Sequence, residues 1–125
     1  MKLGSLKLKL QLVCGDAYAL GPGKADLLDA IGREGSISGA ARAMGMSYRR
    51  AWLLVDEMNR CFEVRLVETA PGGGRTGGAR LTDTGGAVLA AYRELESEAA
   101  RIAEHAAYQR LVAPLRDTPE PTARR

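Results

Sequence analysis

The fold of this chain is decided by the stretch Ser36-Ile37-Ser38-Gly39-Ala40-Ala41-Arg42-Ala43-Met44-Gly45-Met46-Ser47. Ser38 is a suitable N-cap for a short helix, and the small side chains of Ala40 and Ala41 allow a neighbouring helix to approach closely. Gly45 supplies the tight backbone that a turn requires, and Ser47 caps the helix that follows. Two helices joined by a short turn that contains glycine are typical of a helix-turn-helix.

The second helix of this pair is predicted to run from Tyr48 to about Cys61, and its two faces differ in character. At about 100° per residue, one side gathers the residues that should face the core, Ala51, Val55, Met58 and Phe62. The opposite side carries Arg49, Leu53, Asp56 and Arg60, with Arg50 and Trp52 on the flanks. A further helix is expected before the pair, over residues 24–33, with Gly35 as its stop.

Three segments predict a small β component. Residues 5–13 alternate leucines with Lys7, Lys9 and Gln11, which is typical of a half-buried strand. Residues 64–69 and 79–81 are expected to form two further strands. The glycine-rich segment between them holds a single arginine, Arg75, so a flexible hairpin of this kind is interpreted as a wing.

The last predicted helix is capped by Thr82 and continues to about Leu111. A seven-residue repeat runs along it and comprises Val88, Tyr92, Leu95, Ala99, Ile102 and Ala106. This stripe either pairs with a second copy of the chain or lies on its own domain; we favour pairing, because so small a domain has too little core to cover it. The fold class is therefore mainly α with a small β component: a winged helix-turn-helix over residues 1–112, with a dimerisation helix at about 82–112 and a flexible tail at 113–125.

Charge and composition narrow the function classes. The chain has 125 residues and a formal net charge of +3. Residues 36–81 hold seven arginines against four acidic residues, a local net charge of +3, which is compatible either with a polyanion partner or with an ordinary solvated surface. With two cysteines, one histidine and no long apolar run, we expect no metal, no cofactor, no membrane span, no enzymatic activity and a cytoplasmic location.

Several motifs together resemble a known family. They are Ser36-Ile37-Ser38-Gly39-Ala40-Ala41, Met46-Ser47-Tyr48-Arg49-Arg50-Ala51-Trp52, Asp56-Glu57-Met58-Asn59, and the run from Val67-Glu68-Thr69 through the glycines to Leu81-Thr82. Over about residues 5–110 the chain resembles the DNA-binding domain of the ModE molybdate-responsive regulators, and more distantly the LysR-type regulators. The resemblance implies a homodimer that binds an inverted repeat near molybdenum-related genes.

The same resemblance implies which residues contact DNA: Ser47, Tyr48, Arg49, Arg50 and Trp52, with Arg75 reaching from the wing. Full-length members of the family also carry a Mop-type molybdate-binding module with a Thr-Ser-Ala-Arg-Asn-like signature. Nothing in residues 1–125 matches that signature. We therefore expect DNA binding by this chain not to depend on molybdate.

The residue types themselves suggest which side chains contact bases and which contact phosphates on duplex DNA. Arg49 is best placed to enter the major groove and bind guanine, while Arg50, Arg75 and Arg80 suit phosphates. Ser47 and Tyr48 can donate to phosphate at the helix start. Trp52 suits either a packed edge of the core or a contact with thymine methyl groups, and the resemblance favours DNA.

Two alternative functions are a winged-helix module that docks proteins, which the outward Leu53 would favour, and a small oxyanion-binding protein.

Overall fold

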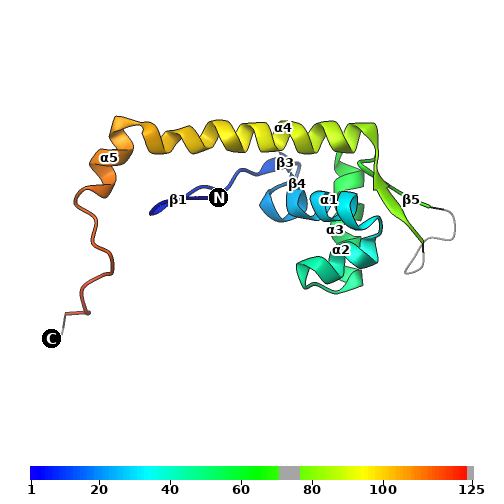
Figure 1. Cartoon of the computed structure of the whole chain (residues 1–125), viewed down its shortest axis with the longest axis horizontal. Helices are drawn as coiled ribbons and strands as arrows, with labels where there is room; N and C mark the ends of the chain where they lie inside the picture. The colour runs from blue at the N-terminus through cyan, green and yellow to red at the C-terminus, as the bar shows by residue number, and fades with distance from the viewer. Residues whose placement is uncertain (71–76, 124–125) are drawn as a thin grey trace.

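Three short helices pack together at one end of the molecule in the computed structural model, which describes residues 1–70 and 77–123 (Figure 1). They are α1 (Pro22–Glu34), α2 (Ile37–Met44) and α3 (Tyr48–Cys61). Gly35 ends α1 and Gly45 ends α2, both in the left-handed backbone region that glycine adopts without strain, with φ of 75° and 67°. The predicted helix-turn-helix is confirmed.

The N-cap of α2 differs from the expectation. Ser36, and not Ser38, has the extended backbone of a cap, and its hydroxyl oxygen accepts a hydrogen bond from the Gly39 amide at 2.9 Å. Ser38 lies inside the first turn, where its hydroxyl accepts from the Arg42 guanidinium. Ser36 is favoured over Ser38 as the N-cap because the Ser36 side chain can reach a backbone amide that has no partner within the helix.

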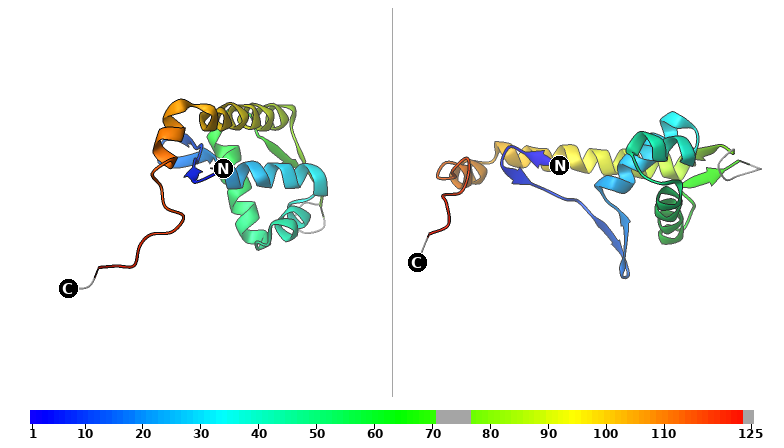
Figure 2. Two further views of the ribbon diagram at one scale, coloured as in Figure 1. Left: turned by 60° about the vertical axis from the view of Figure 1, so that its left-hand side comes forward. Right: turned by 90° about the horizontal axis from the view of Figure 1, so that it is seen from below.

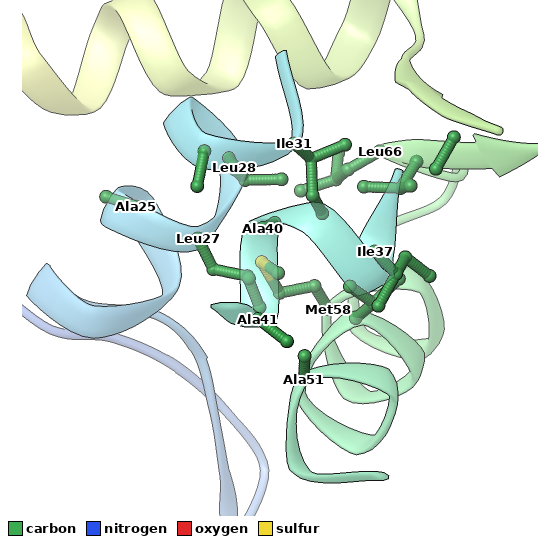
Figure 3. Packing of buried hydrophobic residues seen from close by; sticks show 14 of the residues in the cluster. Ala25, Leu27, Leu28, Ile31, Ile37, Ala40, Ala41, Ala51, Met58 and Leu66 are labelled. Carbon is green, nitrogen blue, oxygen red and sulfur yellow. The ribbon is translucent and has the colours of Figure 1, made fainter. Parts of the chain in front are cut away.

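The core lies where the three helices meet. Leu27, Leu28 and Ile31 of α1 are fully buried, as is Met58 of α3. Figure 3 shows the Met58 side chain pointing into the space between α1 and α2, next to Ala41. Small side chains on α2 leave room for this long one, so the two helices of the motif pack closely.

The wing is a two-stranded antiparallel hairpin of β5 (Val67–Thr69) and β6 (Ala79–Leu81). β5 begins three residues later than expected. The preceding segment is instead tied to neighbouring side chains, since the Leu66 amide donates to Asn59 Oδ1 and Thr82 Oγ1 donates to the Arg65 carbonyl. Arg75, the residue expected at the tip of the wing, lies outside the described residues.

The single strand expected over residues 5–13 is wrong. The chain forms two small antiparallel hairpins, one of β1 (Lys2–Leu3) with β2 (Leu6–Lys7) and one of β3 (Leu12–Cys14) with β4 (Ala17–Leu20). Gly4 and Gly15 make the turns with φ of 61° and 59°, conformations that other residues rarely adopt. The alternation of leucines with polar residues reflects one half-buried side of an extended segment and not one continuous strand.

The last helix is also interrupted, which corrects the expected continuous helix to Leu111. α4 (Asp83–Ala100) is followed by a 3-10 turn (Arg101–Glu104) and then by α5 (Ala106–Val112). His105 takes an extended backbone conformation, and its Nδ1 accepts a hydrogen bond from the Ala107 amide. His105 therefore caps a new helix, and α4 and α5 run in different directions (Figure 1).

Two tyrosines attach the N-terminal segment to these helices. The Tyr92 hydroxyl of α4 donates to the Leu10 carbonyl at 2.9 Å, and the Tyr108 hydroxyl of α5 donates to the Leu3 carbonyl at 2.8 Å. The first hairpin consequently lies beside the long helix, and the chain then diverges from the helix toward the β3–β4 hairpin, as Figure 2 shows from below. At the other end, Gly85 brings α4 against the Leu66 carbonyl, where a Cβ atom would lie 2.1 Å from the oxygen.

The architecture is mainly α with a small β component, as predicted, and within the described residues this component consists of three two-stranded sheets. Thr82 caps α4 through its hydroxyl, as expected. Residues 113–123 form no helix or strand, and the flexibility of the tail at 113–125 stays a prediction. Among the described helices, none is long and apolar enough to span a bilayer.

Candidate nucleic-acid interface

The predicted helical phase of α3 is confirmed by burial. Ala51, Val55 and Met58 are buried, and Phe62, just past the helix end, is half-buried against the same core. This face holds α3 on α1 and α2, so the opposite face points away from the protein. The outward face carries the residues that were expected to meet DNA.

The first turn of α3 presents polar groups in a fixed orientation. Ser47 caps the helix, because its hydroxyl oxygen accepts a hydrogen bond from the Arg50 amide at 3.1 Å. Arg49 and Arg50 follow at once, both exposed, and neither makes an ion pair within residues 1–70 and 77–123. Tyr48 is half-buried against the core, which leaves only part of its ring accessible. The unpaired guanidinium groups therefore gather at the positive end of the helix dipole, where an anion is favoured.

Other arginines of this region already have acidic partners. Arg60 Nε lies 2.9 Å from Asp56 Oδ2, and this hydrogen bond raises the pKa of the Arg60 guanidinium. On the wing, Arg80 Nη2 lies 2.7 Å from Glu68 Oε2 across the β5–β6 ladder. Both pairs are exposed, so a phosphate can compete for these arginines, although it must displace a carboxylate.

Two large apolar side chains complete the outward surface of α3. Trp52 is 44% exposed and Leu53 is 46% exposed. Trp52 is therefore partly accessible, which is compatible with both alternatives, a packed edge of the core and a contact with thymine methyl groups. Leu53 lies in a shallow depression with Arg49, Arg50 and Arg60, so the surface combines apolar area with cationic groups.

Arg42 is a polar residue of this region that the sequence reasoning did not assign to the interface. It lies in the last turn of α2, is exposed, and donates from Nη1 to the Ser38 hydroxyl at 3.3 Å. The proximity of α2 and α3 brings this charge near the start of α3. Its position in the first helix of a helix-turn-helix could have indicated a backbone contact.

A second surface lies along α4, beside the N-terminal segment. An apolar groove there is lined by Leu10, Gln11, Leu12, Leu20, Phe62, Val88, Ala91, Tyr92, Leu95, Glu98 and Ala99. Leu12 and Leu95, in this groove, are 50% and 64% exposed. The contribution of the β3–β4 hairpin was missed, because the register of one long strand does not place Leu12 beside α4.

The predicted stripe of α4 falls into two parts. Val88 is half-buried and Tyr92 is 6% exposed, and both pack against their own domain. Leu95 and Ile102 are exposed, at 64% and 43%. Ala99 is half-buried and Ala106 is exposed at the start of α5. The exposed members of the stripe therefore all lie beyond Tyr92.

Arg93 fixes how α4 sits on the helix-turn-helix. Its guanidinium bonds Asp26 and Asp29 of α1 and Glu96 of its own helix, each at 2.8 Å. These carboxylates raise the pKa of Arg93. Across the part of the chain that the structure describes, no group of three or more His, Cys, Asp or Glu side chains is arranged so that it could hold a metal ion.

Comparison with known proteins gives a family. Residues 24–86, which include most of α1, all of α2 and α3 and both wing strands, match the family model of bacterial regulatory helix-turn-helix proteins, lysR family. The chain is 46% identical over 87 residues to the molybdenum-pterin-binding protein MopA of Rhodobacter capsulatus, covering 70% of this chain and 33% of that protein. It is 45% identical over 80 residues to the molybdenum transport protein ModE of Azotobacter vinelandii, covering 64% and 30%.

A third relative is the DNA-binding transcriptional dual regulator ModE of Escherichia coli K12, 44% identical over 71 residues, covering 57% of this chain and 27% of that protein. The chain thus spans about a third of the length of the curated relatives it matches. The resemblance to ModE-type regulators is confirmed. Because the family model covers half of the chain, and because that half forms the observed helix-turn-helix, the protein belongs to the LysR family of bacterial regulatory helix-turn-helix proteins.

Proposed function

We propose that the protein is a transcription regulator that recognises specific sequences in double-stranded DNA through α3. The observation that supports this most strongly is the capped first turn of α3, where Arg49 and Arg50 are exposed and unpaired within the described residues. A helix that projects such groups from a helix-turn-helix fits the major groove, whose width admits one α-helix.

The residues divide into those that read bases and those that hold phosphates. Arg49 lies opposite the buried face of α3, so its guanidinium can bind O6 and N7 of a guanine. Ser47, Tyr48 and Arg50 hold the DNA backbone together with the first amides of α3. Trp52 supplies an apolar contact to thymine methyl groups. On the wing, Arg75 and Arg80 neutralise phosphates outside the major groove.

The protein acts as a homodimer on an inverted repeat. Two copies bury the groove between α4 and the N-terminal segment, where Leu12 and Leu95 leave apolar surface exposed. Such pairing presents two α3 helices to successive major grooves, about 34–36 Å apart on one side of the duplex.

The target genes concern molybdenum, because the relatives include molybdenum transport proteins named ModE. The site of action is the cytoplasm, where bacterial DNA lies.

Binding-site selection from a random duplex library tests this function. The selected duplexes should share an inverted repeat, and affinity should fall by orders of magnitude between about 50 and 200 mM salt, as phosphate contacts require. The same duplexes with one half-site scrambled are the control and should bind far more weakly. Molybdate should leave the affinity unchanged. A library that yields no enriched sequence at either salt concentration would refute the proposal.

Leu53 favours a second candidate function. It is 46% exposed at the centre of the outward face of α3, where a protein-docking surface would need an apolar anchor. Replacing Leu53 by Ser separates the two functions, since the change leaves every arginine of α3 in place. If α3 reads DNA, the Leu53→Ser protein retains most of its affinity for the selected duplex. If α3 is a docking surface for a protein, neither the wild-type chain nor the variant has affinity for DNA.

A further inference from the structure

The fold brings together the two cysteines of the chain, which lie 47 positions apart in sequence. Cys14 ends strand β3 and Cys61 is the last residue of α3. The Cys14 thiol donates a weak hydrogen bond to the Cys61 carbonyl, with 3.8 Å between Sγ and the oxygen. Cys14 is exposed and Cys61 is half-buried, and both are thiols.

A buried lysine holds these two elements together. Lys24 of α1 is 9% exposed, and its Nζ donates both to the Tyr18 carbonyl on β4 and to Glu57 Oε1 on α3. Glu57 lies one helical turn before Cys61, so this bridge fixes the β3–β4 hairpin beside the end of α3. Burial, and then contact with Cys14, raise the pKa of the Cys61 thiol. The fold therefore holds the side chains of Cys14 and Cys61 next to each other.

We propose that Cys14 and Cys61 form a redox pair, which a low-molecular-weight disulfide such as oxidised glutathione closes into an intramolecular disulfide. The proposal does not depend on DNA binding. Neither cysteine lines the groove assigned to the second subunit, so Cys14 stays accessible in the proposed dimer.

The reaction is a pair of thiol–disulfide exchanges. The Cys14 thiolate attacks one sulfur of oxidised glutathione, forms a mixed disulfide and releases one glutathione thiolate. The Cys61 thiolate then attacks Cys14 Sγ in that mixed disulfide, forms the Cys14–Cys61 bond and releases the second glutathione thiolate. Two electrons pass from the protein to the oxidant, and the two protons of the cysteine thiols end on the two glutathione molecules. Cys14 is the residue that reacts first because it is exposed.

The bond would fix one wall of the apolar groove to another. Leu12 lies two residues before Cys14 on the same strand, and Phe62 directly follows Cys61; both line the groove. A covalent link at the adjacent cysteines holds the hairpin wall at a set distance from the end of α3. Oxidation therefore changes the rigidity of the groove without changing any residue in it.

Incubation of the full chain in glutathione redox buffers tests the pair. In the oxidising buffer the protein should lose both titratable thiols and, by mass spectrometry, two hydrogen atoms, while it stays monomeric on a denaturing non-reducing gel. Its thermal midpoint should rise by on the order of 10 °C, because the bond closes a long loop in the unfolded chain. Dithiothreitol should reverse both changes. Uptake of glutathione without ring closure, a disulfide between two chains, or two unreacted thiols would each overturn the proposal.

Two variants give matched controls. Cys61→Ser should stop at the mixed disulfide and carry one glutathione on Cys14. In the double variant Cys14→Ser with Val13→Cys, the thiol moves one position along β3 to the other face of the strand, at a site that is 62% exposed. This variant should also keep its glutathione adduct. Ring closure at the wild-type rate from position 13 would show that the apposition of Cys14 and Cys61 has no special role.

Discussion

α3 and α4 are both amphipathic, but the domain covers them to different extents. α3 has 14 residues, and its apolar face is buried along most of its length by α1 and α2. α4 has 18 residues, and the only side chain it buries fully is that of Tyr92. Beyond Tyr92 the helix extends past the core, with the N-terminal segment beside it (Figure 1).

The difference indicates what each helix offers to a partner. A helix whose apolar face is already covered has only its polar face left, and on α3 that face carries arginines suited to a polyanion. A helix that extends past its core keeps apolar surface exposed, and such surface favours a protein partner. The two surfaces lie on different elements, so substitutions can separate protein pairing from DNA binding.

Leu95→Glu should have the largest effect. A carboxylate in the groove of the proposed dimer is left without a partner in an apolar seam and should weaken pairing by on the order of 3–5 kcal/mol. Sedimentation should then show a monomer with a wild-type helical spectrum and little affinity for the full inverted repeat. The matched control is Leu111→Glu on α5, which is 69% exposed outside the groove and should remain dimeric. A dimeric Leu95→Glu protein would show that the subunits pair elsewhere.

Arg49→Ala should weaken specific DNA binding by about 1–3 kcal/mol and relax the preference at one position of each half-site. Its oligomeric state and stability should not change, because Arg49 is exposed. Arg101→Ala serves as the control, since it removes the same charge from the 3-10 turn after α4. Binding-site selection compares the two variants. A variant without Arg49 that returns the wild-type motif at wild-type affinity would exclude a base contact.

Ser36→Ala should destabilise the fold by about 1 kcal/mol, because α2 loses the side chain that satisfies its Gly39 amide. Ser38→Ala makes the same chemical change two positions later and should cost less than about 0.5 kcal/mol, since Ser38 caps nothing. Urea denaturation of both variants measures the difference in the free energy of unfolding. Equal losses of unfolding free energy in the two variants would show that Ser38 also contributes to capping α2.

Arg75→Ala should have the smallest effect, a uniform loss of affinity on all sequences. Loss of one phosphate contact lowers the slope of log affinity against log salt by about 1. Measurements at several salt concentrations on one specific and one scrambled duplex test this expectation. Unchanged slopes would place Arg75 outside the DNA interface.

Local patterns predicted most of the helix-turn-helix. The glycine that ends each helix, the Ser47 cap and the spacing of Ala51, Val55 and Met58 act through the backbone within a few residues, so their consequences are visible in the sequence. The match to the family model of bacterial regulatory helix-turn-helix proteins, lysR family, likewise lies within one continuous stretch, residues 24–86. The outward position of Arg49 follows from helical geometry alone.

The predictions that were wrong concern segments that depend on distant partners. The alternating leucines before Leu12 indicate one exposed and one half-buried side, but the chain folds them into hairpins because Gly4 and Gly15 turn it and two tyrosines far along the sequence hold it. The heptad stripe continues past Ala100, but the helix does not, because His105 begins a new one.

The sequence by itself therefore determined the three-helix motif, the wing strands and the charged face of α3, because short-range periodicity and capping specify them. Only the tertiary structure decided that Arg80 already has an acidic partner, that Tyr92 is buried while Leu95 is exposed, and that Cys14 meets Cys61. These facts depend on which surfaces pack against each other across 12 to 82 positions of the chain. Periodicity repeats over a few residues and contains no information about contacts at such separations.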